Sequence, residues 1–148
     1  MQVTQKCQYA LRAIFELAKR NGRGPVKIAE VAEAQDIPPR FLEVILSQLK
    51  QGGFVASQRG AEGGYMLLRQ PDELSVGEVM RFMQGPIGPV ECLLDGKKNC
   101  ALFGSCVFLP MWEKVTKAMT EVYDSTTFQD LVENERNHGV AAPASYSI

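Results

Sequence analysis

Apolar residues recur at steps of three and four along the first fifty positions, which is the spacing of a buried face on an α-helix. A first helix is predicted to begin after Thr4, whose hydroxyl suits an N-cap, and to stop at the glycine- and proline-containing segment 21–25. Its buried stripe consists of Cys7, Ala10, Leu11, Ile14, Leu17 and Ala18.

Two further helices follow, separated by a tight connection at 35–37. A short helix is expected over 27–34, and a longer one from Pro38-Pro39 to about Lys50. Proline suits a first helical turn because the backbone N–H that it lacks has no intrahelical partner there. The buried stripe of the longer helix consists of Leu42, Ile45, Leu46 and Leu49.

After residue 51 the pattern becomes strand-like. Segments 54–57 and 65–68 are predicted strands, and the glycine-rich loop 58–64 between them indicates a β-hairpin. Ser75, with Glu78 three residues later, has the spacing of a capping box and begins a helix that runs to about Gln84. A long helix over 107–123 and a short one over 128–133 complete the predicted elements.

This order predicts a mostly α-helical fold with a small β-hairpin, namely a winged helix-turn-helix followed by a long C-terminal dimerisation helix. We assign the winged-helix domain to 1–84 and a cysteine-containing loop to 85–106. The long helix and the short terminal helix occupy 107–135, and a flexible tail is expected over 136–148.

The long helix carries a heptad-like apolar seam that can pack against its copy in a second subunit. The alternative is a helix packed on its own domain. We favour the dimer, because two recognition helices about 34 Å apart suit a two-fold symmetric DNA site. The seam consists of Phe108, Trp112, Val115, Met119 and Val122.

Composition fits an ordinary globular protein, with 45% hydrophobic and 22% charged residues and a net charge of −1. That net charge conceals an asymmetry. Residues 1–70 carry ten lysines and arginines against six acidic residues, a net charge of +4, whereas residues 71–148 carry six against eleven, a net charge of −5. The basic N-terminal half therefore permits contacts with DNA phosphates. The first residues lack the apolar core of a secretory signal, so a cytoplasmic location is expected.

In a winged helix, the second helix of the turn presents its exposed face to base edges in the major groove. Here Arg40 can reach guanine or phosphate, and Glu43 can accept a hydrogen bond from a cytosine amino group. Arg59, in the glycine-rich wing, can enter the minor groove. The expected DNA contacts are Lys27, Pro38, Pro39, Arg40, Glu43, Ser47 and Arg59.

The motifs resemble a family of winged-helix regulators that includes IscR, NsrR and CymR. The resemblance covers roughly residues 1–133 and implies a homodimer that binds a palindromic operator, with Glu43 in the major groove and Arg59 in the minor groove. One departure is Pro38, where a helix-capping serine is usual, so this cap is expected to be weaker or supplied by Asp36. The matching motifs are Tyr9-Ala10-Leu11-Arg12-Ala13, Phe41-Leu42-Glu43, Arg59-Gly60-x-x-Gly63-Gly64-Tyr65 and Ser75-Val76-Gly77-Glu78-Val79.

Cys92, Cys100 and Cys106 lie within fifteen residues of one another, just before the long helix. Thiolates bind soft metals and iron–sulfur clusters. The resemblance implies a cluster here, with [2Fe–2S] the expected type, because cluster-binding members of the family carry three cysteines in this place. Their usual gaps are five residues, whereas the first gap here has seven, which a flexible loop over 95–98 can absorb.

The fourth ligand is unassigned. Some relatives use a histidine at the position of Leu109, and others a first-helix carboxylate at the position of Gln8. Cys7 can either reach the cluster from the partner subunit or fill the buried stripe of the first helix, as free cysteine readily does. Glu91 and Asp95 remain open, whereas His138, near the C-terminal end, is expected to be merely exposed.

Other functions are less favoured by the same residues. A structural zinc site needs four ligands, and redox-active thiols need a lowered pKa, to which Lys97 and Lys98 can contribute. A clusterless regulator that responds through thiol chemistry or a partner protein is the main alternative. An enzyme is not expected, because no histidine lies near a cysteine in the sequence and no nucleophile–base set is visible. A winged helix that binds a protein instead of DNA is a further alternative.

Overall fold

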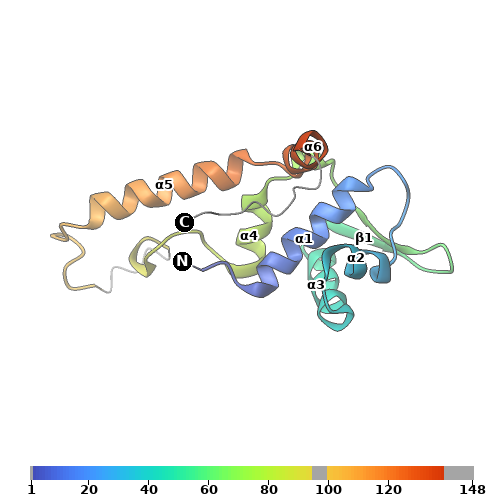
Figure 1. The fold of residues 1–148 in the computed structure, drawn as a ribbon. Coiled ribbons are helices and arrows are strands. Elements are labelled where there is room, and N and C mark those ends of the chain that lie inside the picture. The colour runs from blue at the N-terminus through green and yellow to red at the C-terminus, as the bar shows by residue number, and fades with distance from the viewer. Residues whose placement is uncertain (1, 95–99, 139–148) are drawn as a thin grey trace.

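The computed structural model describes residues 2–94 and 100–138 (Figure 1). This part of the chain contains six α-helices, two 3-10 turns and one antiparallel hairpin, in the order expected for a winged helix-turn-helix. The elements are α1 Gln5–Lys19, α2 Ile28–Gln35, α3 Pro39–Gln51, β1 Val55–Gln58, β2 Gly64–Leu67, η1 Pro71–Glu73, α4 Val76–Gln84, η2 Glu91–Leu93, α5 Leu109–Ser125 and α6 Phe128–His138.

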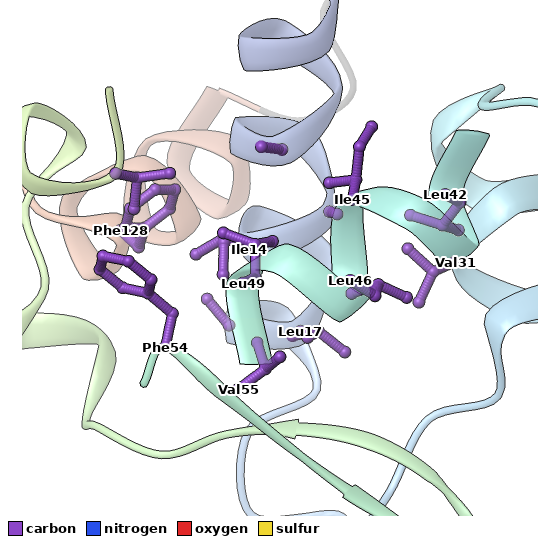
Figure 2. Close-up of a cluster of buried hydrophobic side chains, with 14 of the residues drawn as sticks. Ile14, Leu17, Val31, Leu42, Ile45, Leu46, Leu49, Phe54, Val55 and Phe128 are labelled. Carbon is purple, nitrogen blue, oxygen red and sulfur yellow. The ribbon is translucent and has the colours of Figure 1, made fainter. Parts of the chain in front are cut away.

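The predicted buried stripes of α1 and α3 are confirmed and form the centre of the core. Leu42, Ile45, Leu46 and Leu49 are all buried, as are the residues of the α1 stripe except Leu11, which is partly buried. Figure 2 shows the side chains of α1 and α3 meeting between the two helices, with Phe54 and Phe128 closing one end. Thr4 caps α1 as predicted, because its Oγ1 accepts a hydrogen bond of 3.1 Å from the Cys7 backbone N–H.

Helix α6 is longer than predicted and belongs to the winged-helix core. It continues to His138, whereas the sequence pattern indicated an end at 133. Phe128 is fully buried and Val132 is 3% exposed, both within the core cluster. The Phe128 N–H donates to the Leu74 carbonyl at 3.1 Å, which ties the start of α6 to the segment before α4. Of the expected tail, residues 139–148 lie outside the described part of the chain.

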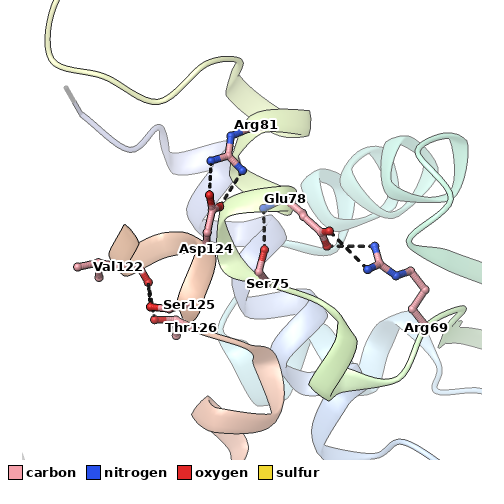
Figure 3. A network of polar contacts seen from close by, with 8 residues as sticks. All are labelled: Arg69, Ser75, Glu78, Arg81, Val122, Asp124, Ser125 and Thr126. Carbon is pink, nitrogen blue, oxygen red and sulfur yellow. Dashed lines mark hydrogen bonds and ion pairs between the residues drawn. The ribbon is translucent and has the colours of Figure 1, made fainter. Parts of the chain in front are cut away.

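Only half of the predicted capping box forms at α4. Ser75 Oγ accepts from the Glu78 N–H at 3.2 Å. The Glu78 carboxylate pairs instead with Arg69, whose Nη1 lies 3.0 Å from Glu78 Oε2 (Figure 3). An ion pair with a residue outside the helix has therefore replaced the local contact that the spacing suggested.

Helix α5 reaches away from the winged-helix body and is joined to it through α4 (Figure 1). Arg81 on α4 makes two hydrogen bonds to Asp124 on α5, at 2.7 and 2.8 Å (Figure 3). Gly77 leaves the space for this pair, since a Cβ there would overlap Asp124 Oδ1. Met119 and Tyr123 of α5 pack against a small cluster that contains Cys7.

The expected single seam of α5 divides into two faces. Met119 turns towards α4 of its own chain, whereas Phe108, just before the helix, is 58% exposed and Val122 is 62% exposed. Met111 and Val115 are also exposed, at 46% and 37%. One face of α5 packs against α4 of the same chain, and the other stays exposed. A heptad pattern gives the helical spacing of apolar residues but not the surface that each one contacts, so the sequence alone did not distinguish the two faces.

The Arg81–Asp124 pair predicts an acid-sensitive contribution to stability. Its hydrogen bond lowers the pKa of Asp124 below the usual value of 3.8. A lowered carboxyl pKa in the folded state stabilises the fold above the unfolded value, and this contribution disappears as the pH falls through the folded pKa. The Tm of Asp124→Asn is therefore expected to lie below that of the wild type at neutral pH, by a margin that shrinks below pH 3.8.

Thermal melts monitored by circular dichroism across this pH range measure the margin. Asp72→Asn serves as the control, because Asp72 is exposed and forms no ion pair or hydrogen bond with the described residues. A margin that is absent at neutral pH, or that Asp72→Asn reproduces, would contradict the assigned role of the pair.

Candidate nucleic-acid interface

The turn between α2 and α3 is fixed by contacts that the sequence pattern did not reveal. Arg12 on α1 donates from Nη2 to the carbonyls of Gln35 and, at 3.2 Å, of Asp36. Asp36 has a left-handed backbone with φ of 50°, a conformation that aspartate tolerates better than most residues. Ile37 is 3% exposed and anchors the turn in the core. The direction of α3 relative to α1 is therefore set by both hydrogen bonding and burial.

Helix α3 presents a polar face opposite its leucine stripe. Pro39, Arg40, Glu43 and Ser47 are exposed on this face, as predicted. Neither the Arg40 nor the Glu43 side chain forms a hydrogen bond or ion pair with another described residue, so both remain available for an external partner. Pro38 is the N-cap residue and is exposed, but no side chain caps α3. The suggestion that Asp36 supplies the cap is therefore wrong, and the cap is the weaker one that proline implies.

The hairpin forms a wing with a well-fixed base. Its register pairs Val55 with Leu67 and Gln58 with Gly64. Strand β2 is also bridged to the segment before α2, where Val26 and Tyr65 exchange two backbone hydrogen bonds of 2.8 Å. Gly64 permits this approach, since a Cβ there would overlap the Val26 carbonyl.

Arg59 lies at the tip of the wing, in the turn that Gly60 closes. Gly60 has φ of +106°, a conformation that favours glycine, and its carbonyl accepts from the Gly63 N–H at 3.0 Å. The Arg59 side chain is exposed and makes no hydrogen bond or ion pair within the described ranges. Lys27, at the N-cap of α2 beside the hairpin base, is likewise exposed.

The recognition helix and the wing are tied together. Lys50 Nζ at the end of α3 donates to Ser57 Oγ in β1 at 2.7 Å, and the Phe54 N–H donates to the Leu49 carbonyl at 3.0 Å. Figure 1 shows the hairpin leaving directly beside α2 and α3. The helix face and the wing are therefore held in a fixed relation before any ligand arrives, although single-residue patterns gave no sign of the Lys50–Ser57 contact.

The three clustered cysteines lie outside the core. Cys92 in η2 and Cys106 before α5 are half-buried, and Cys100 is exposed. Within residues 2–94 and 100–138, no three His, Cys, Asp or Glu side chains are gathered closely enough to hold a metal ion. Asp95, Lys97 and Lys98, considered above as a ligand and as modifiers of thiol pKa, lie outside the described residues.

Cys7 occupies a different environment from these three. It is fully buried beside Met80 and Ile87, and this burial raises the pKa of its thiol. A raised thiol pKa disfavours the thiolate that ligates metals, so the structure supports the packing role for Cys7. Of the other candidates for a fourth ligand, Glu91 is exposed in η2 and His138 is exposed at the end of α6. Gln8, at the position where some relatives carry a carboxylate, donates to the Val3 carbonyl at 3.0 Å.

Comparison with known proteins places these features in a family. The profile of Rrf2, described as an iron-dependent transcriptional regulator, matches residues 3–134. CymR, an HTH-type transcriptional regulator of Bacillus subtilis, is 37% identical over 131 residues, which cover 88% of this chain and 89% of CymR. IscR of Sodalis glossinidius, also an HTH-type transcriptional regulator, is 34% identical over 135 residues, covering 91% of this chain and 81% of IscR.

Solved structures show the same architecture. The solved structure of CymR, the global cysteine regulator of B. subtilis, superimposes with a TM-score of 0.75 at 34% identity, covering 90% of this chain and 98% of that one. T. potens IscR gives a TM-score of 0.77 at 32% identity, covering 96% of this chain and 93% of that one.

Among the described residues, no helix combines the length and the apolar composition that a membrane span needs.

These relatives are named as regulators of transcription, which confirms the expectation that the chain is not an enzyme. The match over residues 3–134, together with the fold of six helices and a wing, shows that the chain belongs to the Rrf2 family of transcriptional regulators.

Proposed function

We propose that the chain binds a palindromic operator as a homodimer, with α3 in the major groove and the wing in the minor groove. The observation that carries this proposal is the polar face of α3. Its side chains are exposed, lack partners among the described residues and are joined to the wing by the Lys50–Ser57 hydrogen bond. A preorganised surface of this kind binds DNA without first ordering itself, so less binding free energy is lost.

The proposed contacts divide by their chemistry. Glu43 accepts from a cytosine amino group and Arg40 donates to guanine or phosphate, while Arg59 enters the negative minor groove. Lys27 adds a positive charge at the N-terminal end of α2, where the helix dipole also favours a phosphate. Pro38, Pro39 and Ser47 complete the surface that meets the duplex.

The homodimer is supported by the exposed face of α5. Phe108, Met111, Val115 and Val122 are all more than a third exposed, and they recur along one side of the helix. A contiguous apolar surface of this kind is costly to leave in water and is typical of a subunit interface. A second copy related by two-fold symmetry offers the same face, so the surface is self-complementary.

We further propose that Cys92, Cys100 and Cys106 ligate an iron–sulfur cluster, as the resemblance to cluster-binding regulators implies. Their chemistry fits, because three thiolates are suitable ligands for such a cluster and none of the three is committed to the hydrophobic core. The described residues do not gather the three side chains into one site. Ligation therefore requires a rearrangement of the segment 92–106.

The position of these cysteines suggests how such a sensor acts. The segment 85–108 connects α4 to α5, and Arg81 of α4 is hydrogen-bonded to Asp124 near the other end of α5. A segment closed around a shared ligand has fewer arrangements than an open one, so it favours particular orientations of α5. Because α5 carries the proposed dimer face, a change in its orientation changes the spacing of the two recognition helices, which is a population shift between dimer geometries.

Anaerobic purification followed by absorption spectroscopy and iron and sulfide analysis tests the cluster. We expect a coloured protein with bound iron and sulfide, and the loss of both from Cys92→Ala, Cys100→Ala and Cys106→Ala. Cys7→Ala is the matched control and is expected to keep them, because its thiol lies in the core. A colourless, iron-free wild type whose cysteine variants bind DNA normally would contradict the sensor.

A clusterless regulator that uses thiol chemistry or a partner protein is the second candidate. It is favoured by the absence of a gathered set of metal ligands among the described residues and by the similarity to CymR, the global cysteine regulator of B. subtilis. Exposed Cys100 is the thiol most open to reaction. The same spectra separate the two candidates, since only the first predicts iron.

A further inference from the structure

A cleft of about 810 Å³ opens between α2 and α6, over the C-terminal half of α1. Its volume lies within the range of small-molecule sites, which is about 300–1,000 Å³. Figure 1 shows α6 and α3 on opposite sides of α1, and no residue of the recognition helix α3 lines the cleft. Neither the proposed DNA contacts nor the three clustered cysteines line it.

The lining of the cleft carries an excess of positive charge. Lys19 and Arg20 are already paired, with Lys19 Nζ 3.1 Å from Glu135 Oε1 and Arg20 Nε 3.3 Å from Glu16 Oε2. Arg23 and Arg136 also line the cleft. Neither side chain forms an ion pair or hydrogen bond with a described residue. Two unpaired guanidinium groups are suited to a carboxylate or a phosphate, which each can bind with two parallel hydrogen bonds.

Two glutamates contribute buried carboxylate oxygens to the floor and one wall of the cleft. Glu16 at its floor has a side chain only 3% exposed, and its Oε1 accepts from Gln35 Nε2 of α2 at 3.2 Å. On the α6 side, Glu135 Oε2 is buried and has no hydrogen-bond donor among the described residues. Burying a carboxylate oxygen without a hydrogen-bond donor costs free energy. A ligand amino group near this wall would supply the missing donor, provided that the Glu135 carboxylate rotates towards the ligand.

We propose that this cleft binds a small zwitterionic metabolite, whose carboxylate or phosphate contacts Arg23 and Arg136 and whose amino group pairs with Glu135. Such a ligand touches α2, the first helix of the helix-turn-helix, and α6, which follows α5. It therefore resists movement of α2 relative to α6 and acts as an effector of operator affinity. This last consequence rests on the proposed DNA-binding function, whereas ligand binding itself does not.

Isothermal titration calorimetry of the full chain, without DNA, tests the site. The probes are phosphoethanolamine and L-glutamate, which combine an amino group with a phosphate or with carboxylates, and the comparison ligands are inorganic phosphate and ethanolamine. Saturable binding of at least one probe is expected, and whichever binds identifies the preferred anionic group. Arg23→Gln and Arg136→Gln are each expected to weaken it about tenfold or more.

The control is Lys114→Gln on α5, which removes an exposed positive charge outside the cleft and is expected to leave binding unchanged. Glu135→Gln separates the two halves of the ligand, because it should weaken phosphoethanolamine or L-glutamate but not inorganic phosphate. Unchanged melting temperatures show that the variants are folded. The proposal is overturned if neither probe binds saturably, if inorganic phosphate binds as well as the probes, or if Lys114→Gln matches the arginine variants.

Discussion

Replacing both Val115 and Val122 with glutamate is expected to convert a dimer into a monomer and to weaken operator binding by about 100-fold or more. Both side chains are exposed in the single chain, at 37% and 62%, so the substitutions remove no core packing. In a two-fold symmetric interface, each introduced glutamate would pack against the apolar face of the partner's α5, which carries the same two glutamates. Desolvating these carboxylates without partners is costly, and a monomer grips only one half-site.

Sedimentation velocity and fluorescence anisotropy measure the two effects. The DNA is a duplex that the wild-type protein selects from a random library, since the operator is unknown. Lys117→Glu is the matched control, because Lys117 is 79% exposed on the side of α5 away from the apolar residues. If the double variant sediments and binds as the wild type does, α5 is not the dimer interface.

The second large effect is expected at the recognition surface. Glu43→Ala should relax the preference for one base pair, and Arg59→Ala should weaken binding to all sequences, each by about 1–3 kcal/mol or about 5- to 150-fold. Neither side chain has a partner within the described residues, so stability should not change. Titrating the selected duplex and its single-base variants distinguishes lost specificity from lost affinity.

Glu62→Ala provides the control for the wing. Glu62 is exposed in the same loop as Arg59 and makes no hydrogen bond or ion pair with a described residue. Its removal should leave affinity unchanged or slightly raise it, because one negative charge near the phosphates is lost. Equal losses from Glu62→Ala and Arg59→Ala would show that any change in the loop disturbs binding, and would remove the specific role of Arg59.

Local sequence patterns predicted the elements well where a helix packs against one surface only. The leucine stripe of α3 faces a single core, so its spacing identified the buried residues directly. The wing was also predictable from the sequence, because a glycine-rich loop between two short apolar segments is typical of a β-hairpin. The expected strand 54–57 is observed as Val55–Gln58, a shift of one residue.

Prediction failed where distant segments compete for the same residues. The carboxylate of Glu78 was expected to cap its own helix but pairs with Arg69. The α5 seam was read as one face, although α4 takes Met119 and leaves Val122 exposed. Arg12, which holds the turn before α3, belongs to a first helix whose pattern says nothing about the carbonyls it reaches.

The candidate sites show the same division. Residue types and their spacing identified the polar face of α3, and the structure exposes each predicted contact. The cysteines were recognisable as soft ligands, but their arrangement depends on the conformation of a connecting loop, which no periodicity encodes. The charged cleft beside α6 was not predicted, because Arg23 and Arg136 are 113 positions apart and line one cleft only as a result of the fold.

The salt dependence of DNA binding tests most directly whether α3 and the wing grip a duplex together. Contacts with several phosphates release counterions, so affinity should fall about a thousandfold or more between about 50 and 200 mM salt. Arg59→Ala should reduce the slope of log affinity against log salt by about one. An affinity that hardly changes with salt, with the same slope in the wild type and Arg59→Ala, would contradict this account.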